Sequence, residues 1–421
     1  MKYILVLTAL VAAITLSCKT KSGTQNDKDI TFTIENPSGT KLSDHAITIT
    51  NKALIAKVDS VFGKNFAIYD EEICKSEAID FKNDGIIDAI ILICNLNPGE
   101  VNVFKIREVE KVEALAKKTQ AEISIKEGGE WKIVTKKNGA QQYEYVGGDW
   151  KNIDYLKVPE QHTDHSFYIR YEGPGWESDK VGYRFYLDWR NANDIYGKKV
   201  DTVVLQGVGL DNFDSYHEMQ DWGVDILKVG NSLGIGSIAY WMDGKANRVA
   251  ETDSIVAKII LNGNLESGIK TKYYGWQVGN KKTNLKSKLY IDAGSRLTKE
   301  EITLDPAIDN ICTGIVKHDK GELLLPEGIT DGWSYIATYG QQTLQDNNLG
   351  MVVFYNMINF KEVTNDEFSH VVVLTPEDNM LTYYFAAAWE LESGGIKTKE
   401  DFISYLNQTV DVLNNPVKVT F

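Results

Sequence analysis

The densest group of side chains able to do chemistry lies between residues 162 and 191. Two of the six histidines, three arginines, several carboxylates and several aromatic residues fall within these thirty positions. A guanidinium can pair with a carboxylate or sulfate, and an aromatic face can stack on a sugar ring. A Gly-Pro-Gly turn at 173–175 predicts that the group is exposed. A strand pair with a charged outer face is the alternative, and we favour a binding site.

A second group follows between residues 211 and 241. Tyr216, His217 and Lys228 offer a proton donor, a proton acceptor and a positive charge close together in the sequence. The glycine-rich stretch at 230–236 lacks the Lys-Ser/Thr ending of a phosphate loop, so it is predicted to form tight turns. No Gly-x-Ser-x-Gly motif is present, and a serine hydrolase is therefore not favoured.

Metal binding is an alternative at two places. His162, His165 and His217 could ligate zinc, but their spacing fixes no third ligand, and we expect histidines without a metal. The run 80–88 (DFKNDGIID) has the look of a calcium loop. Lys82 stands where an oxygen ligand is expected, so a β-turn between two strands is favoured. The sequence thus predicts no cofactor, with calcium as the alternative.

The first residues have the pattern of an export signal. Lys2 precedes an apolar run at 4–14, which is too short to span a bilayer as a mature helix. Small residues lie before Cys18, which predicts a signal peptide at 1–17 and lipidation of this cysteine, with plain secretion as the alternative. The polar residues of the segment 18–30 are expected to form a flexible tether.

Composition limits the partners and the redox chemistry. The net charge is −14 without a dense basic run, so we expect no nucleic-acid partner. An anionic substrate therefore needs a local cluster of arginine or lysine. Cys74, Cys94 and Cys312 cannot form a disulfide framework. A single bridge between Cys74 and Cys94 and three reduced thiols are the two alternatives.

Strand patterns recur along the whole chain. Short β-branched stretches such as 30–34 and 200–208 are separated by glycine, asparagine and aspartate. Helix patterns are limited to 109–117 and 399–413, the second with a capping box at Thr398. The predicted fold class is therefore all-β with few helices.

Two unequal domains are expected. The alternating pattern of the first strands ends at a charged stretch near residue 106, which predicts a small N-terminal β-sandwich domain at 31–106. The remainder, 107–421, contains most of the aromatic residues and both groups of candidate side chains. It is expected to be the functional domain.

A family resemblance is carried by two long runs, HTDHSFYIRYEGPGWESDKVGYRFYLDWRNANDIYGKK (162–199) and SYHEMQDWGVDILKVGNSLGIGSIAYWMDGK (215–245). The 80–88 turn, TQAEISIKEGGEWK at 119–132 and YIDAGSRLT at 290–298 belong to it as well. The chain resembles a family of lipoproteins encoded in polysaccharide-utilisation loci of Bacteroidota, one member type of which is the marine ulvan oligosaccharide dehydratase. These motifs are less specific for substrate, because related loci serve pectins and other uronates.

The resemblance implies a galactose-mutarotase-like β-supersandwich behind the small N-terminal domain, with a site on the concave sheet. The implied partner is an acidic, sulfated oligosaccharide. The implied reaction removes water from a non-reducing-end glucuronic or iduronic acid and leaves a 4,5-unsaturated uronyl end. Family members usually carry an acidic residue where Lys82 stands, which argues against an inherited metal at that turn.

This chemistry requires a positive partner for the uronate carboxylate, a base for the C5 proton and an acid for the departing 4-hydroxyl. Arg184, Arg190 and Lys228 are the candidate charge partners, in that order. His217 is the preferred base and His165 the second. The acid candidates are Tyr216, Tyr183 and the histidine that is not the base.

Further residues are expected to bind the substrate. Glu177 and Asp179 could orient the catalytic groups or bind sugar hydroxyls, and a structural salt bridge with Arg184 is the alternative. The remaining predicted binding residues are His162, Trp176, Trp189 and Trp222, for whose indoles a place in the core is the alternative.

Three function classes stay open: the dehydratase, a polysaccharide lyase that cleaves a uronate polymer by β-elimination, and a non-catalytic glycan-binding lipoprotein. Residues 19–21 lack the acidic run that often accompanies surface export. This favours an outer-membrane lipoprotein that faces the periplasm. The sequence does not fix the oligomeric state.

Overall fold

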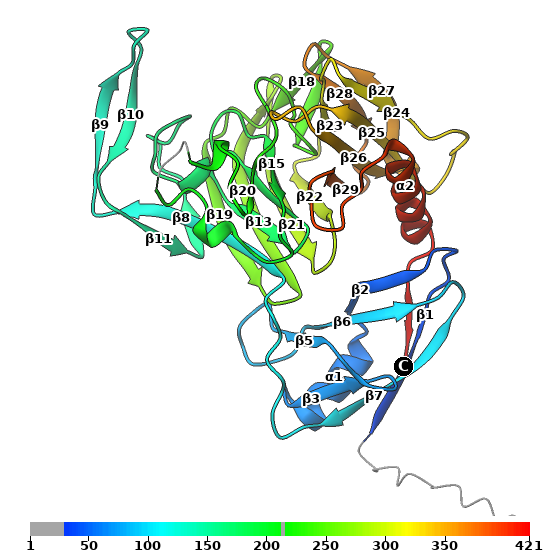
Figure 1. Cartoon of the computed structure of the whole chain (residues 1–421). Coiled ribbons are helices and arrows are strands. Elements are labelled where there is room, and N and C mark those ends of the chain that lie inside the picture. Colours follow the sequence, from blue (N-terminus) through cyan, green and yellow to red (C-terminus); the bar gives the residue numbers. More distant parts are fainter. Residues whose placement is uncertain (1–28, 212–214) are drawn as a thin grey trace, which may run out of the picture.

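The computed structural model describes residues 29–211 and 215–421, which form mainly antiparallel β-structure (Figure 1). The described part contains two α-helices, so the predicted all-β class with few helices is confirmed. The predicted signal peptide and the lipidation site at Cys18 lie outside the described residues. Within the described ranges, no helix is long and apolar enough to cross a membrane.

The N-terminal part contains two small sheets and helix α1, which share one hydrophobic cluster. Its elements are β1 (Ile30–Glu35), β2 (Leu42–Ile49), α1 (Lys52–Phe62), β3 (Phe66–Tyr69), β4 (Ile73–Cys74), β5 (Ser76–Ile79), β6 (Ala89–Leu96) and β7 (Val101–Glu108). Alternation along β1 buries Ile30, Phe32 and Ile34. The last strand, β30 (Lys418–Thr420), pairs with β1, so this sheet uses both ends of the described chain.

The larger part is built from a six-stranded, a nine-stranded and a five-stranded sheet together with a two-stranded hairpin. The six-stranded sheet, in spatial order, contains β11 (Asp149–Ile153), β8 (Thr119–Glu127), β13 (Gly175–Ser178), β14 (Val181–Phe185), β15 (Asn193–Lys198) and β16 (Gly223–Asp225). The hairpin consists of β9 (Glu130–Thr135) and β10 (Gln141–Val146).

The other two sheets contain the remaining strands. In spatial order, the nine-stranded sheet contains β12 (Tyr155–Lys157), β19 (Ser254–Asn262), β20 (Glu266–Val278), β21 (Lys281–Asp292), β22 (Leu297–Asp305), β29 (Met380–Trp389), β26 (Asn348–Asn356), β25 (Trp333–Gln341) and β24 (Gly321–Leu324). The five-stranded sheet contains β18 (Lys245–Arg248), β17 (Ala239–Met242), β23 (Ile311–Val316), β28 (Ser369–Leu374) and β27 (Phe360–Asn365).

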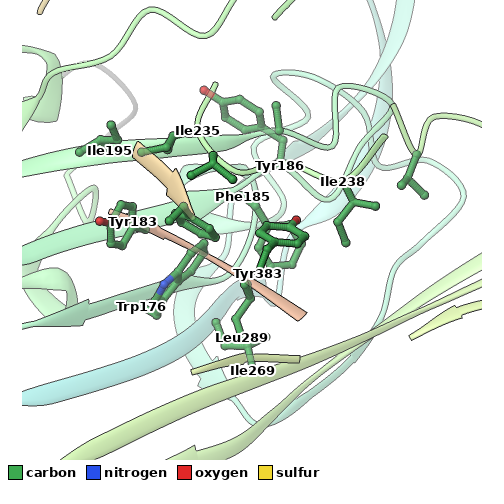
Figure 2. Packing of buried hydrophobic residues seen from close by; sticks show 14 of the residues in the cluster. Trp176, Tyr183, Phe185, Tyr186, Ile195, Ile235, Ile238, Ile269, Leu289 and Tyr383 are labelled. Carbon is green, nitrogen blue, oxygen red and sulfur yellow. The ribbon is translucent and has the colours of Figure 1, made fainter. Parts of the chain in front are cut away.

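The main core joins the six-stranded sheet to the nine-stranded sheet (Figure 2). The rings of Trp176 and Tyr183 stack with their centroids 5.5 Å apart. Phe385 of β29 meets Tyr183 edge to face, also at 5.5 Å. The Tyr183 hydroxyl donates to the carbonyl of Arg296 and accepts from the amide of Ala387, each at 2.9 Å. This packing holds β13 and β14 firmly against β29.

Sequence periodicity predicted one of the two helices correctly. Helix α2 (Lys399–Asn414) confirms the prediction, and the amide of Asp401 donates to Thr398 Oγ1 at 3.1 Å. The helix predicted at 109–117 is wrong, because these residues form an extended connection with Val112 exposed. A short helix without a buried apolar face is unstable. Helix α1, with its cap at Asn51, was not predicted.

The turn at 80–88 connects β5 to β6, which confirms the predicted β-turn between two strands. The Lys64 ammonium lies 3.0 Å from the Asp80 carboxylate, and Lys82 lies 2.6 Å from Asp88. The hydrogen bond from Lys64 lowers the pKa of Asp80 to about 2. Lysine side chains therefore hold the carboxylates that a calcium ion needs as ligands.

Three cysteines are described, and Cys74, Cys94 and Cys312 are all free thiols. Cys94 and Cys312 are buried. Burial raises the pKa of Cys94 to about 12. The structure agrees with the alternative of three reduced cysteines.

A buried pair of carboxyl groups lies near the junction of the two parts. Glu266 of β20 and Asp292 of β21 are direct cross-strand partners. One oxygen of each, Glu266 Oε2 and Asp292 Oδ1, is buried and has no hydrogen-bond partner among the described residues. Burial raises the pKa of Glu266 to about 8, and that of Asp292 to about 7. The folded state therefore favours the neutral form of both groups.

This pair predicts a loss of stability in alkaline solution. The folded-state pKa values lie above the ordinary values. The contribution of the neutral pair to the free energy of unfolding is therefore complete below about pH 4 and is lost as the pH rises through 7 and 8. We expect the melting temperature of Glu266→Gln to fall less than that of the wild type between pH 6 and pH 9. Calorimetry with the exposed Glu362→Gln as control tests this. Equal slopes for both variants would contradict it.

Candidate functional site

The strands β14, β15 and β16 bring three charged side chains together. Arg184 of β14 lies directly opposite Asp194 of β15, and Tyr196 of β15 lies opposite Asp225 of β16. Side chains that are opposite or two residues apart in paired strands share one face of the sheet. Arg184, Asp194 and Asp225 therefore point to the same side.

Arg184 is the centre of a buried hydrogen-bond network. Its guanidinium donates to Asp194 Oδ2 and to Asp225 Oδ2, both at 2.7 Å, and to the Tyr216 hydroxyl at 2.9 Å. The Tyr186 hydroxyl donates to the same Asp194 oxygen at 2.6 Å. Burial, followed by the charge of Asp194, raises the pKa of Asp225 well above its usual range. One arginine thus faces two carboxylates.

This burial changes the role expected for Arg184. The residue is 2% exposed, and its donors already face protein oxygens. Contact with a substrate carboxylate does not fit this position. Arg184 instead holds Asp225 and Tyr216 in place. Arg170, the third arginine of the sequence cluster, is also buried and is paired with Glu122.

His217 lies at the solvent side of this network. It belongs to the short 3-10 helix η3 (Ser215–His217), and its side chain is 36% exposed. Its Nε2 atom is 3.5 Å from Asp225 Oδ2. Burial raises the pKa of the adjacent Tyr216, so this phenol stays protonated at neutral pH. A half-exposed imidazole backed by a buried carboxylate is suited to proton transfer.

A second group of charges surrounds Arg190. The guanidinium lies 2.9 Å from Asp164 and 2.9 Å from Glu172, and 2.5 Å from Asp188. His165 Nδ1 is hydrogen-bonded to Asp164 and lies 3.7 Å from Glu172. The hydrogen bond to Asp164 raises the pKa of His165, so the imidazolium is favoured. The His165 side chain is 38% exposed and Arg190 is 13% exposed.

Tyr186 joins the two groups into one site. The Arg190 guanidinium lies over the Tyr186 ring, 4.0 Å from the ring centroid. The Tyr186 hydroxyl donates to Asp194. An arginine over a phenol ring is an attractive arrangement. The site therefore contains His217 with the buried Asp225 on one side and His165 with Arg190 on the other.

The backbone of the loops around this site is unusual. A left-handed conformation costs free energy in residues other than glycine, and such residues cluster at functional sites. Positive φ angles occur at His165 (57°), Phe167 (58°), Tyr171 (38°), Glu172 (72°) and Asn191 (35°). The buried network and the β13–β15 core hold these loops in position.

A metal ion is an alternative use of part of the site. Asp164, His165 and Glu172 offer ligand atoms within 4.8 Å of one another. Arg190 already pairs with both of these carboxylates, and its positive charge opposes a second cation. Of the three zinc ligands considered from the sequence, His165 is part of this group, whereas His162 and His217 are not. The residues therefore fit a guanidinium better than a metal.

His162 lies behind the loop that carries His165. Its Nδ1 atom is 2.8 Å from the Ser166 hydroxyl, whereas its Nε2 atom is buried without a partner among the described residues. Burial lowers the pKa of His162 to about 4, so the ring is neutral at physiological pH. This position supports the loop and gives no direct contact surface for a substrate.

Glu177 and Asp179 lie outside the site. Glu177 Oε2 is 2.6 Å from the buried Lys198 ammonium. Asp179 is paired with Lys118 at 2.8 Å and accepts from the amide of Gly294 at 2.6 Å. The alternative of a salt bridge with Arg184 is therefore wrong for both residues, and their contacts are structural.

The aromatic candidates separate by burial. Trp176 is 1% exposed and its indole donates to Thr298 at 2.8 Å, so it belongs to the core and cannot stack on a sugar. Tyr183 is in the same core and does not act as the acid. Trp222 packs against Tyr196, which lies under the Arg184 guanidinium. Trp189, beside Arg190 in the chain, is 48% exposed.

Lys228 is exposed and follows Asp225 by three residues. Asp194, Tyr186 and Asp188 are the members of the site that sequence reasoning did not single out. Asp188 lies within the charged group at 162–191 and Asp194 three residues after it, but their partners depend on strand register and loop geometry. No local signal identifies them.

The fold and the site define a β-protein with a buried arginine–carboxylate network beneath two partly exposed histidines. The family model described as "Domain of unknown function (DUF4861)" matches residues 34–419, so the chain belongs to this family. No match was found among the curated proteins.

Solved structures give remote similarities. An α-mannosidase from Enterococcus faecalis V583 aligns with a TM-score of 0.45, 10% identity and coverage of 94% of this chain and 46% of that chain. A glycosyl hydrolase family 38 protein from Enterococcus faecalis aligns with a TM-score of 0.41 and 10% identity, and the alignment covers 94% of this chain and 48% of that chain. A protein assigned as an aldose 1-epimerase from Klebsiella pneumoniae aligns with a TM-score of 0.31 and 9% identity, and the alignment covers 70% of this chain and 96% of that chain. The chain spans less than half of the first two, and these scores support no argument about activity.

Proposed function

We propose that this protein is a dehydratase that removes water from the non-reducing-end uronic acid of an acidic oligosaccharide. The observation that carries the proposal is the pairing of the half-exposed His217 with the buried Asp225 beside Arg190 and His165, two cationic side chains that share the carboxylates of Asp164 and Glu172. The resemblance to the family with an ulvan oligosaccharide dehydratase supports the substrate class. The glucuronic or iduronic acid of ulvan is the preferred substrate.

In the proposed reaction, His217 accepts the proton from C5 of the uronic acid. The electron pair of the C5–H bond forms the C4–C5 double bond, and the C4–O bond breaks. Charge that develops on the carboxylate requires a positive partner. Arg190, which is 13% exposed, takes this role in place of the buried Arg184, and the substrate carboxylate replaces one of its three protein carboxylate partners. His165, whose pKa is raised, donates a proton to the departing hydroxyl, which leaves as water.

The test is mass spectrometry with ultraviolet absorbance on ulvan oligosaccharides that have a saturated uronic acid at the non-reducing end. We expect the wild type to lower the mass by one water and to raise the absorbance without shortening the chain. His217→Ala is expected to lose this activity. The exposed His318→Ala is the matched control, and it is expected to behave as the wild type.

Two outcomes would contradict the proposal. A rise in absorbance with shorter products indicates a polysaccharide lyase that cuts by β-elimination. Binding of the oligosaccharide without a change of mass, together with unchanged affinity in His217→Ala, indicates a non-catalytic glycan-binding protein.

The proposal includes the compartment. The signal-like run at 4–14 and the small residues before Cys18 support a lipoprotein anchored in the outer membrane and facing the periplasm, where oligosaccharides arrive. Cys18→Ser is expected to move the protein from the detergent phase to the aqueous phase in a partition experiment. An unchanged distribution would argue for plain secretion.

A further inference from the structure

The hairpin of β9 and β10 has no third strand among the described residues, and it projects at the far left of the larger part in Figure 1. An isolated two-stranded hairpin is only marginally stable in water. The apolar side chains of the hairpin are therefore expected to contact something other than a third strand.

One face of this hairpin is aromatic and apolar. Trp131 is paired with Tyr145 and Ile133 with Tyr143, and the alternation of a strand places all four on one face. Ile133 is 59% exposed and Tyr143 is 43% exposed. Contiguous exposed apolar side chains of this kind mark a binding surface. We call these four residues the hairpin strip.

The hairpin strip leads to the candidate site. The rings of Trp131 and Tyr145 lie 5.1 Å and 5.0 Å from the ring of Tyr168. The amide of Tyr145 donates to the carbonyl of Ser166 at 2.7 Å. Gln142 Nε2 donates to the carbonyl of His165 at 3.3 Å. The strip itself thus packs on Tyr168, and the other face of the hairpin, through Gln142, is bonded to His165 of the same loop.

The charges near the strip suit an acidic ligand. The strand β9 and the hairpin tip contain Lys132, Lys136 and Lys137, although the whole chain has a net charge of −14. Lys132 is paired with Glu130 at 2.9 Å, whereas Lys137 is exposed at the tip. A local positive group on an acidic protein attracts anions to this surface.

We propose that the hairpin strip binds the sugar residues that follow the non-reducing end of an acidic oligosaccharide. This rests on the proposed function for the placement of the first sugar. Tyr143 and Ile133 contact the apolar faces of the following rings, and Lys137 pairs with their carboxylate or sulfate groups. Chain length is then recognised by an element that does not take part in proton transfer.

The test compares ulvan disaccharides with hexasaccharides. For Tyr143→Ala we expect the ratio of the hexasaccharide KM to the disaccharide KM to rise about three- to tenfold. The matched control is Val146→Ser, because Val146 is 43% exposed on the opposite face of the same hairpin. Its ratio is expected to equal that of the wild type. An unchanged ratio for Tyr143→Ala, or an equal rise for Val146→Ser, overturns the inference.

Calorimetric binding of the hexasaccharide to His217→Ala, with and without Tyr143→Ala, separates this inference from the proposed function. If no water is lost by the wild type but Tyr143→Ala still weakens binding about three- to tenfold, the strip is confirmed and the dehydratase is not. If water is lost and the hexasaccharide affinity does not change, the strip is wrong. A wild-type dimer that Tyr143→Ala dissociates would show that a second copy covers the strip, and would also overturn it.

Discussion

Replacing Arg184 with methionine is expected to lower the free energy of unfolding by about 3–5 kcal/mol. The guanidinium is buried between Asp194 and Asp225, and its removal leaves two buried carboxyl groups next to each other without their shared cation. The Tyr216 hydroxyl also loses its hydrogen-bond donor. Urea unfolding followed by tryptophan fluorescence measures the effect.

Two further variants test the cause of this loss. The double variant Arg184→Met/Asp194→Asn is expected to regain part of the stability, because one of the two neighbouring buried acidic groups is removed. Arg107→Met is the control, since Arg107 is 45% exposed and pairs with Asp29 at 3.0 Å. Exposed pairs contribute about 0–1 kcal/mol. Equal losses for Arg184→Met and Arg107→Met would show that the network does not stabilise the fold.

Asp225→Asn is expected to lower kcat about 10²- to 10⁴-fold with little change in KM. The amide has nearly the same size, so the backbone of β16 stays in place. The amide cannot exchange a proton with His217 Nε2, 3.5 Å away, and proton transfer then loses its orienting carboxyl group. Asp225 is a positioning residue in this account, because it acts through His217.

The split between kcat and KM distinguishes this role from a structural one. A variant that merely loosens the site is expected to raise KM and to lower the melting temperature. Asp225→Asn removes one of two neighbouring acidic groups, so its melting temperature is expected to equal or exceed that of the wild type. The exposed Asp346→Asn serves as the control. A wild-type kcat for Asp225→Asn would remove the support for His217 as the base.

Local patterns predicted the class of fold because they depend on neighbouring residues. Alternation gives strands such as β1, and a capping residue with an apolar face gives α2. The same reasoning failed at 109–117, where the charged residues follow a helix-like pattern but no surface buries it. Whether a marginal helix forms depends on packing, which the local sequence does not contain.

The sequence by itself determined that the strands would dominate and that the chemically active side chains would gather at 162–191 and near His217. Only the tertiary structure decided which of them face solvent. Strand register places Arg184 against Asp194 and Asp225 and buries it, and the core removes Trp176 from the site. Register and packing join residues far apart in the chain, so a local pattern cannot specify them.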